Sequence, residues 1–183
     1  VSVQNSLVAS GLVRSGSPAQ RERFLPGLVS GKIIGAFALT EADAGSDAGA
    51  IRSRATRQGN GYVLNGTKQF ISSGKTASLT LTFAVTDPDK GKRGISAFLI
   101  PTDRPGYHVD KVEHKLGQAA SDTCALRFDN LALEGDLRLG EELAAVLGHA
   151  GLVRALVHRA GDDVGGAHAV GGGDRLGRPE TAG

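Results

Sequence analysis

The segment Phe37–Asp47 reads FALTEADAGSD and changes from apolar to acidic and small residues within a few positions. Its first half completes the strand-like segment 33–40, which is rich in apolar residues. Its second half combines the Thr40 hydroxyl with carboxylates and with Gly45 beside Ser46. Such a strand end is either a solvated turn or a loop whose amides and hydroxyls approach a bound anion.

Further strand-like segments follow at short intervals, and no helical pattern separates them. Turn-type dipeptides occur at Asn60-Gly61 and Asn65-Gly66, because asparagine and glycine adopt positive φ at low cost. The expected strands are 33–40, 51–57, 62–64, 70–71, 79–86, 95–100, 107–112 and 125–128. This pattern predicts a mainly β fold, an antiparallel β-sandwich or barrel, over residues 32–139.

Two short helices are expected before the strands. Apolar residues recur at helical spacing within residues 2–14. A second helix begins at Ser17, which can form a capping box with Gln20, and ends at Gly31. Pro26 falls inside this second helix and disfavours its continuity.

The composition excludes several classes of protein. With 21 basic and 19 acidic residues and 4% aromatic residues, the chain has neither the field nor the stacking surface that nucleic acids require. Its one cysteine, Cys124, cannot form an internal disulfide and is expected to be a small buried hydrophobe. No apolar run approaches the roughly 20 residues that span a bilayer, so a cytoplasmic protein without a membrane span is expected.

The start and the end of the chain are both unusual. Because the chain begins at Val1 and contains no methionine, we expect the true start to lie upstream. After Glu142 the sequence lacks Lys, Ile, Phe, Tyr, Ser, Asn and Gln, and Gly, Ala, Val, Arg and His dominate. A helix over 143–157 is compatible with this composition, whereas the glycines beyond it oppose regular structure. We therefore expect 140–183 to be an atypical, helical or irregular tail.

The origin of this tail can be tested at the level of the gene. Our hypothesis is that it is read in a different frame of a high-GC gene, or is a remnant. Sequencing the gene beyond Glu142 in all three frames decides the matter, since an unshifted homologous frame would contradict the hypothesis.

Several patterns resemble catalytic or metal motifs without fitting them. Ser72 and Lys75 have the spacing of penicillin-recognising enzymes, but that serine should begin a helix, and here it follows a strand. A serine hydrolase built on this pair is nevertheless kept as a third alternative. Gly74-Lys75-Thr76 lacks the first glycine of a phosphate loop. The histidines and the acidic residues of the opening segment have no metal-ligand spacing, so no metal site is expected.

Two segments together suit a nucleotide cofactor. Amides and the hydroxyl at Leu39-Thr40 can donate to a polar heterocycle, while the loop 44–46 lets amides and a hydroxyl approach a phosphate. Phe70 and Ser72 lie two positions apart and therefore share one side of a regular strand. There a ring could pack beside the heterocycle and a hydroxyl could face its edge.

These motifs, in this order and spacing, resemble the acyl-CoA dehydrogenase family. The resemblance is carried by FLP (24–26), IGAFALTE (34–41), AGSD (44–47), NGTKQFISSG (65–74), GISAF (94–98), LG (116–117), SDT (121–123) and LGEE (139–142). Ala42 stands where the family often has proline, and Phe70-Ile71-Ser72 stands where it often has Trp-Ile-Thr. Both departures keep the chemical type.

The resemblance implies a middle β-domain that carries FAD. Residues 1–31 would then be the remnant of an N-terminal helical domain, and 32–139 the domain that binds FAD and acyl-CoA. Leu39 and Thr40 would meet the flavin pyrimidine edge, Phe70 and Ile71 would pack along the ring, and Ser72 would approach N5. The implied cofactor set is Phe37, Leu39, Thr40, Gly45, Ser46, Phe70, Ile71 and Ser72, and Ser46 is also implied for the substrate.

The implied reaction is α,β-dehydrogenation of an acyl-CoA thioester with hydride transfer to FAD. The resemblance further implies electron-transfer flavoprotein or a similar acceptor as partner, and a homo-oligomer in the complete enzyme. The family's catalytic glutamate belongs to a helical domain that should follow Glu142, and no position here matches it. We therefore assign no catalytic residue and expect this chain alone to be inactive. The alternative is a non-catalytic β-sandwich binding module derived from the family.

Overall fold

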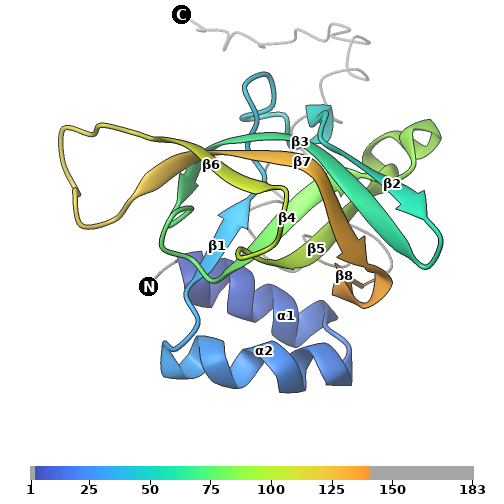
Figure 1. Cartoon of the computed structure of the whole chain (residues 1–183), viewed down its shortest axis with the longest axis horizontal. Helices are drawn as coiled ribbons and strands as arrows, with labels where there is room; N and C mark the ends of the chain where they lie inside the picture. The colour runs from blue at the N-terminus through green and yellow to red at the C-terminus, as the bar shows by residue number, and fades with distance from the viewer. Residues whose placement is uncertain (1–2, 141–183) are drawn as a thin grey trace, which may run out of the picture.

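The computed structural model describes residues 3–140, which form a β-structure with two helical segments packed against one side (Figure 1). The π-helix η1 Gln4–Ala9 continues directly into α1 Ser10–Ser15, and α2 Pro18–Ser30 follows. Both predicted helices are thereby confirmed.

Local signals define both ends of α2. Ser17 and Gln20 form the predicted capping box, with N···O distances of 2.9 and 3.1 Å in its two hydrogen bonds. Gly31 ends the helix with φ +75°. The helix runs unbroken through Pro26, contrary to our expectation. Proline leaves the carbonyl of residue 22 without its helical donor, but Glu22 and Pro26 are both exposed, so water can reach that carbonyl.

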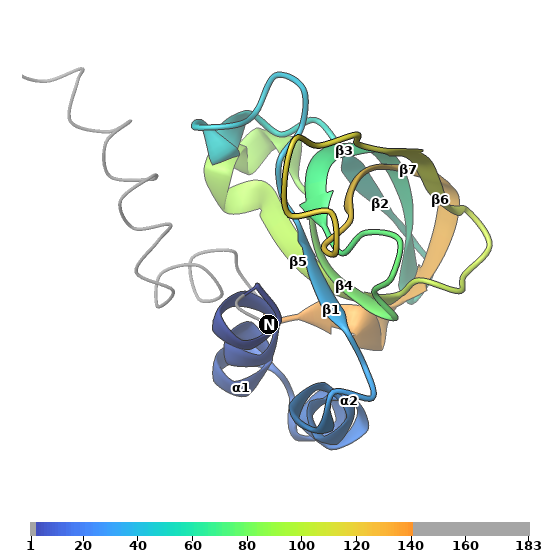
Figure 2. The same cartoon turned by 90° about the vertical axis from the view of Figure 1, so that its left-hand side faces the viewer.

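The strands form one curved sheet, as seen from the side in Figure 2. Their bounds are β1 Gly35–Ala38, β2 Arg54–Gln58, β3 Gly61–Ser72, β4 Leu79–Val85, β5 Ile95–Pro101, β6 Tyr107–Val112, β7 Thr123–Glu134 and β8 Arg138–Leu139. Short 3₁₀ segments lie at Ala48–Ala50, Pro88–Gly94 and Gly135–Leu137. The order is β6-β7-β3-β2-β4-β5-β8, and β1 also pairs with β4. The mainly β fold class is therefore confirmed.

The pairing of β4 differs from a purely antiparallel sheet. β5 occupies one edge of β4, and both β1 and β2 join the other edge in parallel. β1 lies opposite Leu79–Thr82, whereas β2 meets β4 only at Arg54 and Val85. β1 therefore lies next to the second half of β3, which β2 does not reach.

Of the two predicted hairpin turns, one forms and one does not. β2 and β3 are joined by a turn at Gly59 and Asn60, one residue earlier than expected. Asn65-Gly66 instead lies inside β3, where the pairing with β7 shifts register. Asn65 exchanges hydrogen bonds with Asn130 of β7, and Gly66 has φ +146°. The dipeptide thus supplies a β-bulge rather than a turn.

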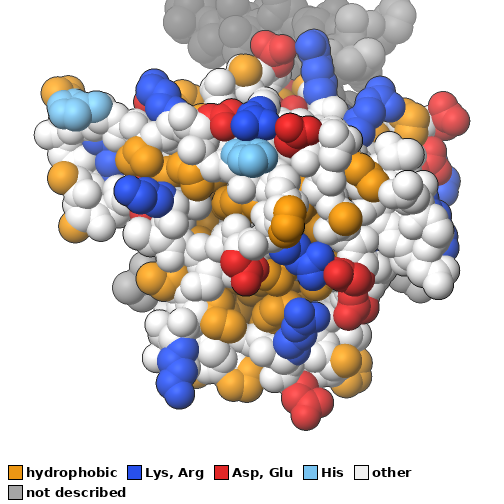
Figure 3. All heavy atoms as spheres, viewed as in Figure 1, with side chains coloured by type: hydrophobic (Ala, Val, Ile, Leu, Met, Phe, Trp, Pro, Cys, Tyr) orange, Lys and Arg blue, Asp and Glu red, His pale blue; other side chains and the backbone are white. Residues whose placement is uncertain are grey.

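The core fills the inside of the curved sheet and continues between the sheet and the helices. Phe83 and Phe98 are fully buried and pack against Phe37 and Tyr62, with ring centroids 5.1 and 5.2 Å apart. Cys124 is buried, as predicted, although its thiol also lies 3.1 Å from a carboxylate oxygen of Asp122. On the face shown in Figure 3, basic and acidic side chains are interspersed with hydrophobic ones.

Two further expectations concern a membrane span and the C-terminal tail. In residues 3–140, no helix has the length and apolar character needed to cross a bilayer. The helix expected at 143–157 and nearly all of the atypical tail lie outside the described residues.

Candidate functional site

The end of β1 meets the second half of β3 at a small set of backbone groups. Gln69 N–H donates to Thr40 C=O at 2.8 Å, and this bond joins the two segments. We use the term β1–β3 edge for the facing groups of Leu39, Thr40 and Gln69–Ser72. Five of the eight residues predicted for the cofactor lie here.

Two backbone donors at the β1–β3 edge have no protein acceptor. In the ladder with β4, alternate residues of β1 turn their backbone groups toward and away from that strand. Leu39 faces away, because its C=O accepts from Lys68 Nζ at 3.0 Å. Within residues 3–140, neither the Leu39 N–H nor the Thr40 N–H donates to another protein group.

A bulge in β3 shapes the other side of this edge. The register with β7 shifts between Lys68 and Ile71, and Phe70 has φ +57°. The expected alternation of Phe70 and Ser72 along a regular strand is therefore interrupted. The Phe70 side chain is 64% exposed, an unusual state for a large aromatic ring, whereas the neighbouring Ile71 side chain lies in the core with 2% exposure.

The turn after β1 leads to two more of the residues predicted for the cofactor. Glu41 and Ala44 exchange backbone hydrogen bonds of 3.2 Å in both directions, which closes a tight turn. Gly45 and Ser46 follow it on the surface. Within the described residues, the hydroxyls of Thr40, Ser46 and Ser72 form no hydrogen bonds to protein groups. Phe37, the eighth predicted residue, is half-buried and packs on Phe83.

Sequence reasoning missed a buried ion pair behind this edge. Lys68 Nζ lies 2.7 Å from Glu41 Oε1, and the Lys68 side chain is fully buried. The Glu41 carboxylate also accepts from the N–H groups of Arg52 at 2.6 Å and Ser53 at 3.0 Å. One carboxylate thus joins three separate segments. Nothing in the local sequence marked this pair, because Lys68 stands between the polar residues Thr67 and Gln69.

Electrostatics keep both members of the pair charged at neutral pH. Burial alone would raise the pKa of Glu41, but the Lys68 ammonium and the hydrogen bonds from Lys68, Ser53 and Arg52 outweigh it and lower that pKa. Burial lowers the pKa of Lys68 to about 8, although the Glu41 carboxylate opposes this shift. The pair therefore places the Lys68 ammonium group against the Leu39 carbonyl.

The lowered pKa of Glu41 predicts a specific acid sensitivity. A carboxyl group whose pKa is lower in the folded state stabilises the fold above its unfolded pKa, and that stabilisation disappears as the pH falls through the folded pKa. Glu41→Gln should be less stable than the wild type near neutral pH but should lose less stability on acidification. Urea denaturation between pH 7 and pH 3 measures this, with the exposed Glu22→Gln as control. If the free energy of unfolding fell equally with pH in Glu41→Gln and in the wild type, the prediction would be wrong.

A second carboxylate anchors the loop after β3. Asp122 accepts from the Lys75 N–H at 2.9 Å and from the Thr76 hydroxyl at 2.7 Å, and its C=O accepts from Ser73 N–H. The Lys75 side chain is exposed, and no hydrogen bond joins it to Ser72 in the described residues. This arrangement offers no activated serine. In residues 3–140, no three His, Cys, Asp or Glu side chains are placed to hold a metal ion.

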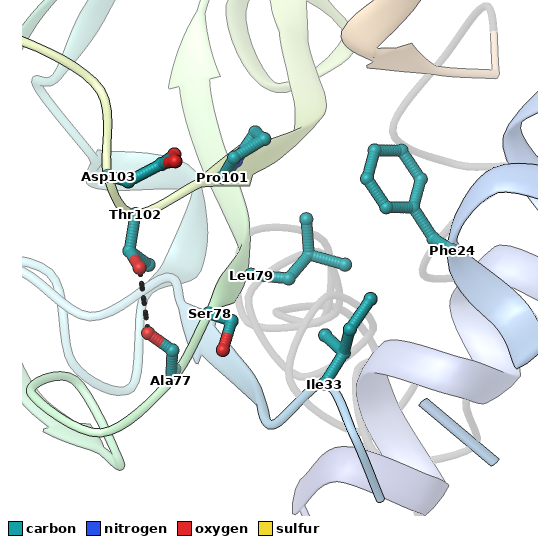
Figure 4. A pocket seen from close by; sticks show the side chains of 8 residues that line it. All are labelled: Phe24, Ile33, Ala77, Ser78, Leu79, Pro101, Thr102 and Asp103. Atoms are coloured by element: carbon teal, nitrogen blue, oxygen red, sulfur yellow. Dashed lines mark hydrogen bonds between the residues drawn. The ribbon is translucent and has the colours of Figure 1, made fainter. Parts of the chain in front are cut away.

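A cavity of about 420 Å³ lies elsewhere, between α2 and the ends of β4 and β5 (Figure 4). Its apolar lining includes Phe24, Ile33 and Leu79, and none of the eight predicted cofactor residues reaches it. The candidate site is therefore an exposed edge, not this cavity.

Comparison with known proteins identifies the domain that the sequence motifs resemble. Residues 36–131 match the family described as acyl-CoA dehydrogenase, middle domain. An acyl-CoA dehydrogenase of Bacillus subtilis is 43% identical over 142 residues, which cover 78% of this chain and 38% of that protein. The chain thus spans well under half the length of this relative.

Two solved structures share the fold. Butyryl-CoA dehydrogenase from Megasphaera elsdenii superposes with a TM-score of 0.75 at 37% identity, covering 83% of this chain and 39% of the other. A glutaryl-CoA dehydrogenase from Mycobacterium smegmatis in complex with FADH2 superposes with a TM-score of 0.73 at 41% identity, covering 82% and 39%. The sequence match and the shared β-fold together establish that this chain belongs to the acyl-CoA dehydrogenase family and contains its middle domain.

Proposed function

We propose that this chain supplies the FAD-binding β-domain of an enzyme that dehydrogenates acyl-CoA thioesters between the α and β carbons. Bound FAD would accept the hydride in that reaction. The residues of this chain would bind and orient the cofactor: Leu39 and Thr40 at the pyrimidine edge, Phe70 beside the ring, and Ser72 near N5. Gly45 and Ser46 would approach the pyrophosphate, and Ser46 would also lie near the acyl-CoA.

The unpartnered donors at the β1–β3 edge carry this proposal. The two N–H groups without a protein acceptor stand at the end of β1, which is hydrogen-bonded to Gln69, the residue before the exposed Phe70. Donors placed at a flavin pyrimidine edge stabilise the negative charge that develops there on reduction, in the manner of an oxyanion site. The buried side chain of Ile71 modifies the proposal, because its contact with the ring would come from the backbone.

The finer features of the enzyme remain proposals of the same kind. In these 183 residues we assign no proton-abstracting base, so we expect the chain alone to be inactive and to bind FAD weakly. Electron-transfer flavoprotein or a similar acceptor, a homo-oligomeric complete enzyme, a cytoplasmic location and the boundaries 1–31, 32–139 and 140–183 also stay predictions. The family membership of the domain supports the predictions about the electron acceptor and the homo-oligomer.

An NMR titration with FAD tests the proposal, since chemical shifts detect binding too weak for most other methods. We expect shifts at Leu39, Thr40, Ser46 and Phe70–Ser72 and small changes on β5 and β6. ATP serves as a control for the adenine and phosphate groups. Shifts that ATP reproduces fully, or that map to other surfaces, would favour the non-catalytic binding module instead. Bleaching of FAD by butyryl-CoA in this chain would contradict the expected inactivity.

Thr40→Val tests the role of one hydroxyl. Valine keeps the shape of threonine and removes the donor, so FAD affinity should fall about three- to tenfold, the value of one neutral hydrogen bond. Thr56→Val makes the same change at an exposed position of β2 and should leave the affinity unchanged. The same NMR titration yields both dissociation constants. Equal affinities for both variants would remove Thr40 from the proposed site.

A further inference from the structure

Lys68 is one of the largest fully buried side chains among the described residues, and it is charged. Burying an ammonium group is costly unless it is paired and hydrogen-bonded. An apolar side chain of similar size would fill the same space without that cost, and such replacements are often neutral or stabilising. The packing of the core therefore does not explain why a lysine occupies this position.

The contacts of Lys68 lie directly behind the β1–β3 edge. Its ammonium group donates to Leu39 C=O and to Glu41 Oε1. The Leu39 C=O and the Thr40 N–H belong to one peptide group. A cation on the carbonyl oxygen polarises that group and strengthens its N–H as a donor, since hydrogen bonds in series reinforce one another by about 10–30%. Lys68 thus acts on the same amide that has no protein acceptor.

Glu41 links the end of β1 to two further segments. Its carboxylate holds the Arg52 and Ser53 N–H groups, while its backbone closes the turn with Ala44. The pair therefore connects the end of β1 with the middle of β3, the segment before β2, and the turn that leads to Ser46. The end of β1, β3 and this turn carry the residues of the proposed flavin site.

We propose that Lys68 and Glu41 are positioning residues that fix the end of β1 against β3 and present the Leu39 and Thr40 amides along the β1–β3 edge. This assignment rests on the proposed flavin function. It makes neither residue a contact of the flavin, because both side chains are buried behind the edge. Their effect passes through the two peptide groups that Lys68 and Gln69 hold.

The test uses a variant designed to remain folded. Lys68→Met combined with Glu41→Gln removes both charges together and leaves no unpaired ion in the interior. The matched control is Lys111→Met with Glu113→Gln, because that ion pair at the end of β6 has the same 2.7 Å separation but is more exposed, at 65% and 24%. Amide hydrogen exchange of the full chain, measured by NMR without FAD, reports the position of β1 through Gln69 N–H and Ala44 N–H.

We expect exchange at Gln69 and Ala44 to accelerate about 10- to 100-fold, the factor that corresponds to loss of a hydrogen bond to a charged group. Amides of β5 should change much less, and the control variant should match the wild type. FAD affinity, measured by the NMR titration above, should fall in the charge-free variant and not in the control.

The outcomes separate the inference from the function on which it rests. Unchanged exchange at Gln69 and Ala44, or equal acceleration throughout β5, would overturn the positioning role. If those amides accelerate and FAD affinity is unaltered, the effect on the flavin site is refuted. If the wild type shows no FAD-dependent shifts while the local acceleration occurs, the proposed function fails and the bracing of β1 stands.

Discussion

Lys68→Met should lower the free energy of unfolding by about 3–5 kcal/mol, because removing one partner of a buried ion pair leaves the other charge uncompensated. Methionine keeps most of the volume of the lysine side chain, so a cavity contributes little. The Glu41 carboxylate would keep its bonds from Arg52 and Ser53 but would lose its cation. Urea denaturation at neutral pH, followed by circular dichroism, measures the loss.

Two companion variants separate this effect from a general sensitivity to substitution. Lys111→Met breaks an ion pair of the same length whose lysine is exposed and whose glutamate is half-buried, and it should cost less than about 1 kcal/mol. Adding Glu41→Gln to Lys68→Met should restore part of the lost stability, since it neutralises the stranded carboxylate. A loss in Lys68→Met no larger than in Lys111→Met would show that the interior tolerates the unpaired Glu41 charge.

The parts of the fold that local chemistry determines were predictable from the sequence. The capping box at Ser17 and Gln20 and the terminal Gly31 define α2 without any tertiary contact. The closely spaced strand-like segments and the turn dipeptides likewise identified the mainly β fold. The family motifs then located the candidate site, and the structure brings residues 39–40 and 70–72 to adjoining edges.

Features that depend on distant contacts were not predictable in this way. Lys68 and Glu41 are 27 residues apart, and neither lies in a pattern that indicates an ion pair. The parallel pairing of β1 with β4 joins segments more than 40 positions apart along the chain, and nothing in either strand specifies its direction. The same limit affected Asn65-Gly66, whose local chemistry suits a hairpin turn equally well. The hydrogen bonds between Asn65 and Asn130 favour the bulge.

Gly66→Ala should reveal how strongly that bulge depends on glycine. A Cβ atom at this position would lie 2.3 Å from Ser53 Oγ and 2.7 Å from Ser53 Cα, and the backbone has φ +146°. Backbone strain of about 1–3 kcal/mol adds to an overpacking cost of similar size. We therefore expect a total loss of about 2–5 kcal/mol in the free energy of unfolding, measured by urea denaturation.

Control variants distinguish the two contributions to this loss. Gly117→Ala introduces the same methyl group where no other atom lies within 4 Å, and it should change stability by less than about 0.5 kcal/mol. Adding Ser53→Gly to Gly66→Ala removes the overlap with the Ser53 side chain but leaves the backbone strain and the close contact with the Cα atom of residue 53, so it should recover only part of the loss. If Gly66→Ala were as stable as Gly117→Ala, β3 could adopt a regular path at residue 66. The register shift there would then be a consequence of the Asn65–Asn130 contact and not of the glycine, because asparagine would be holding the bulge without help from its neighbour.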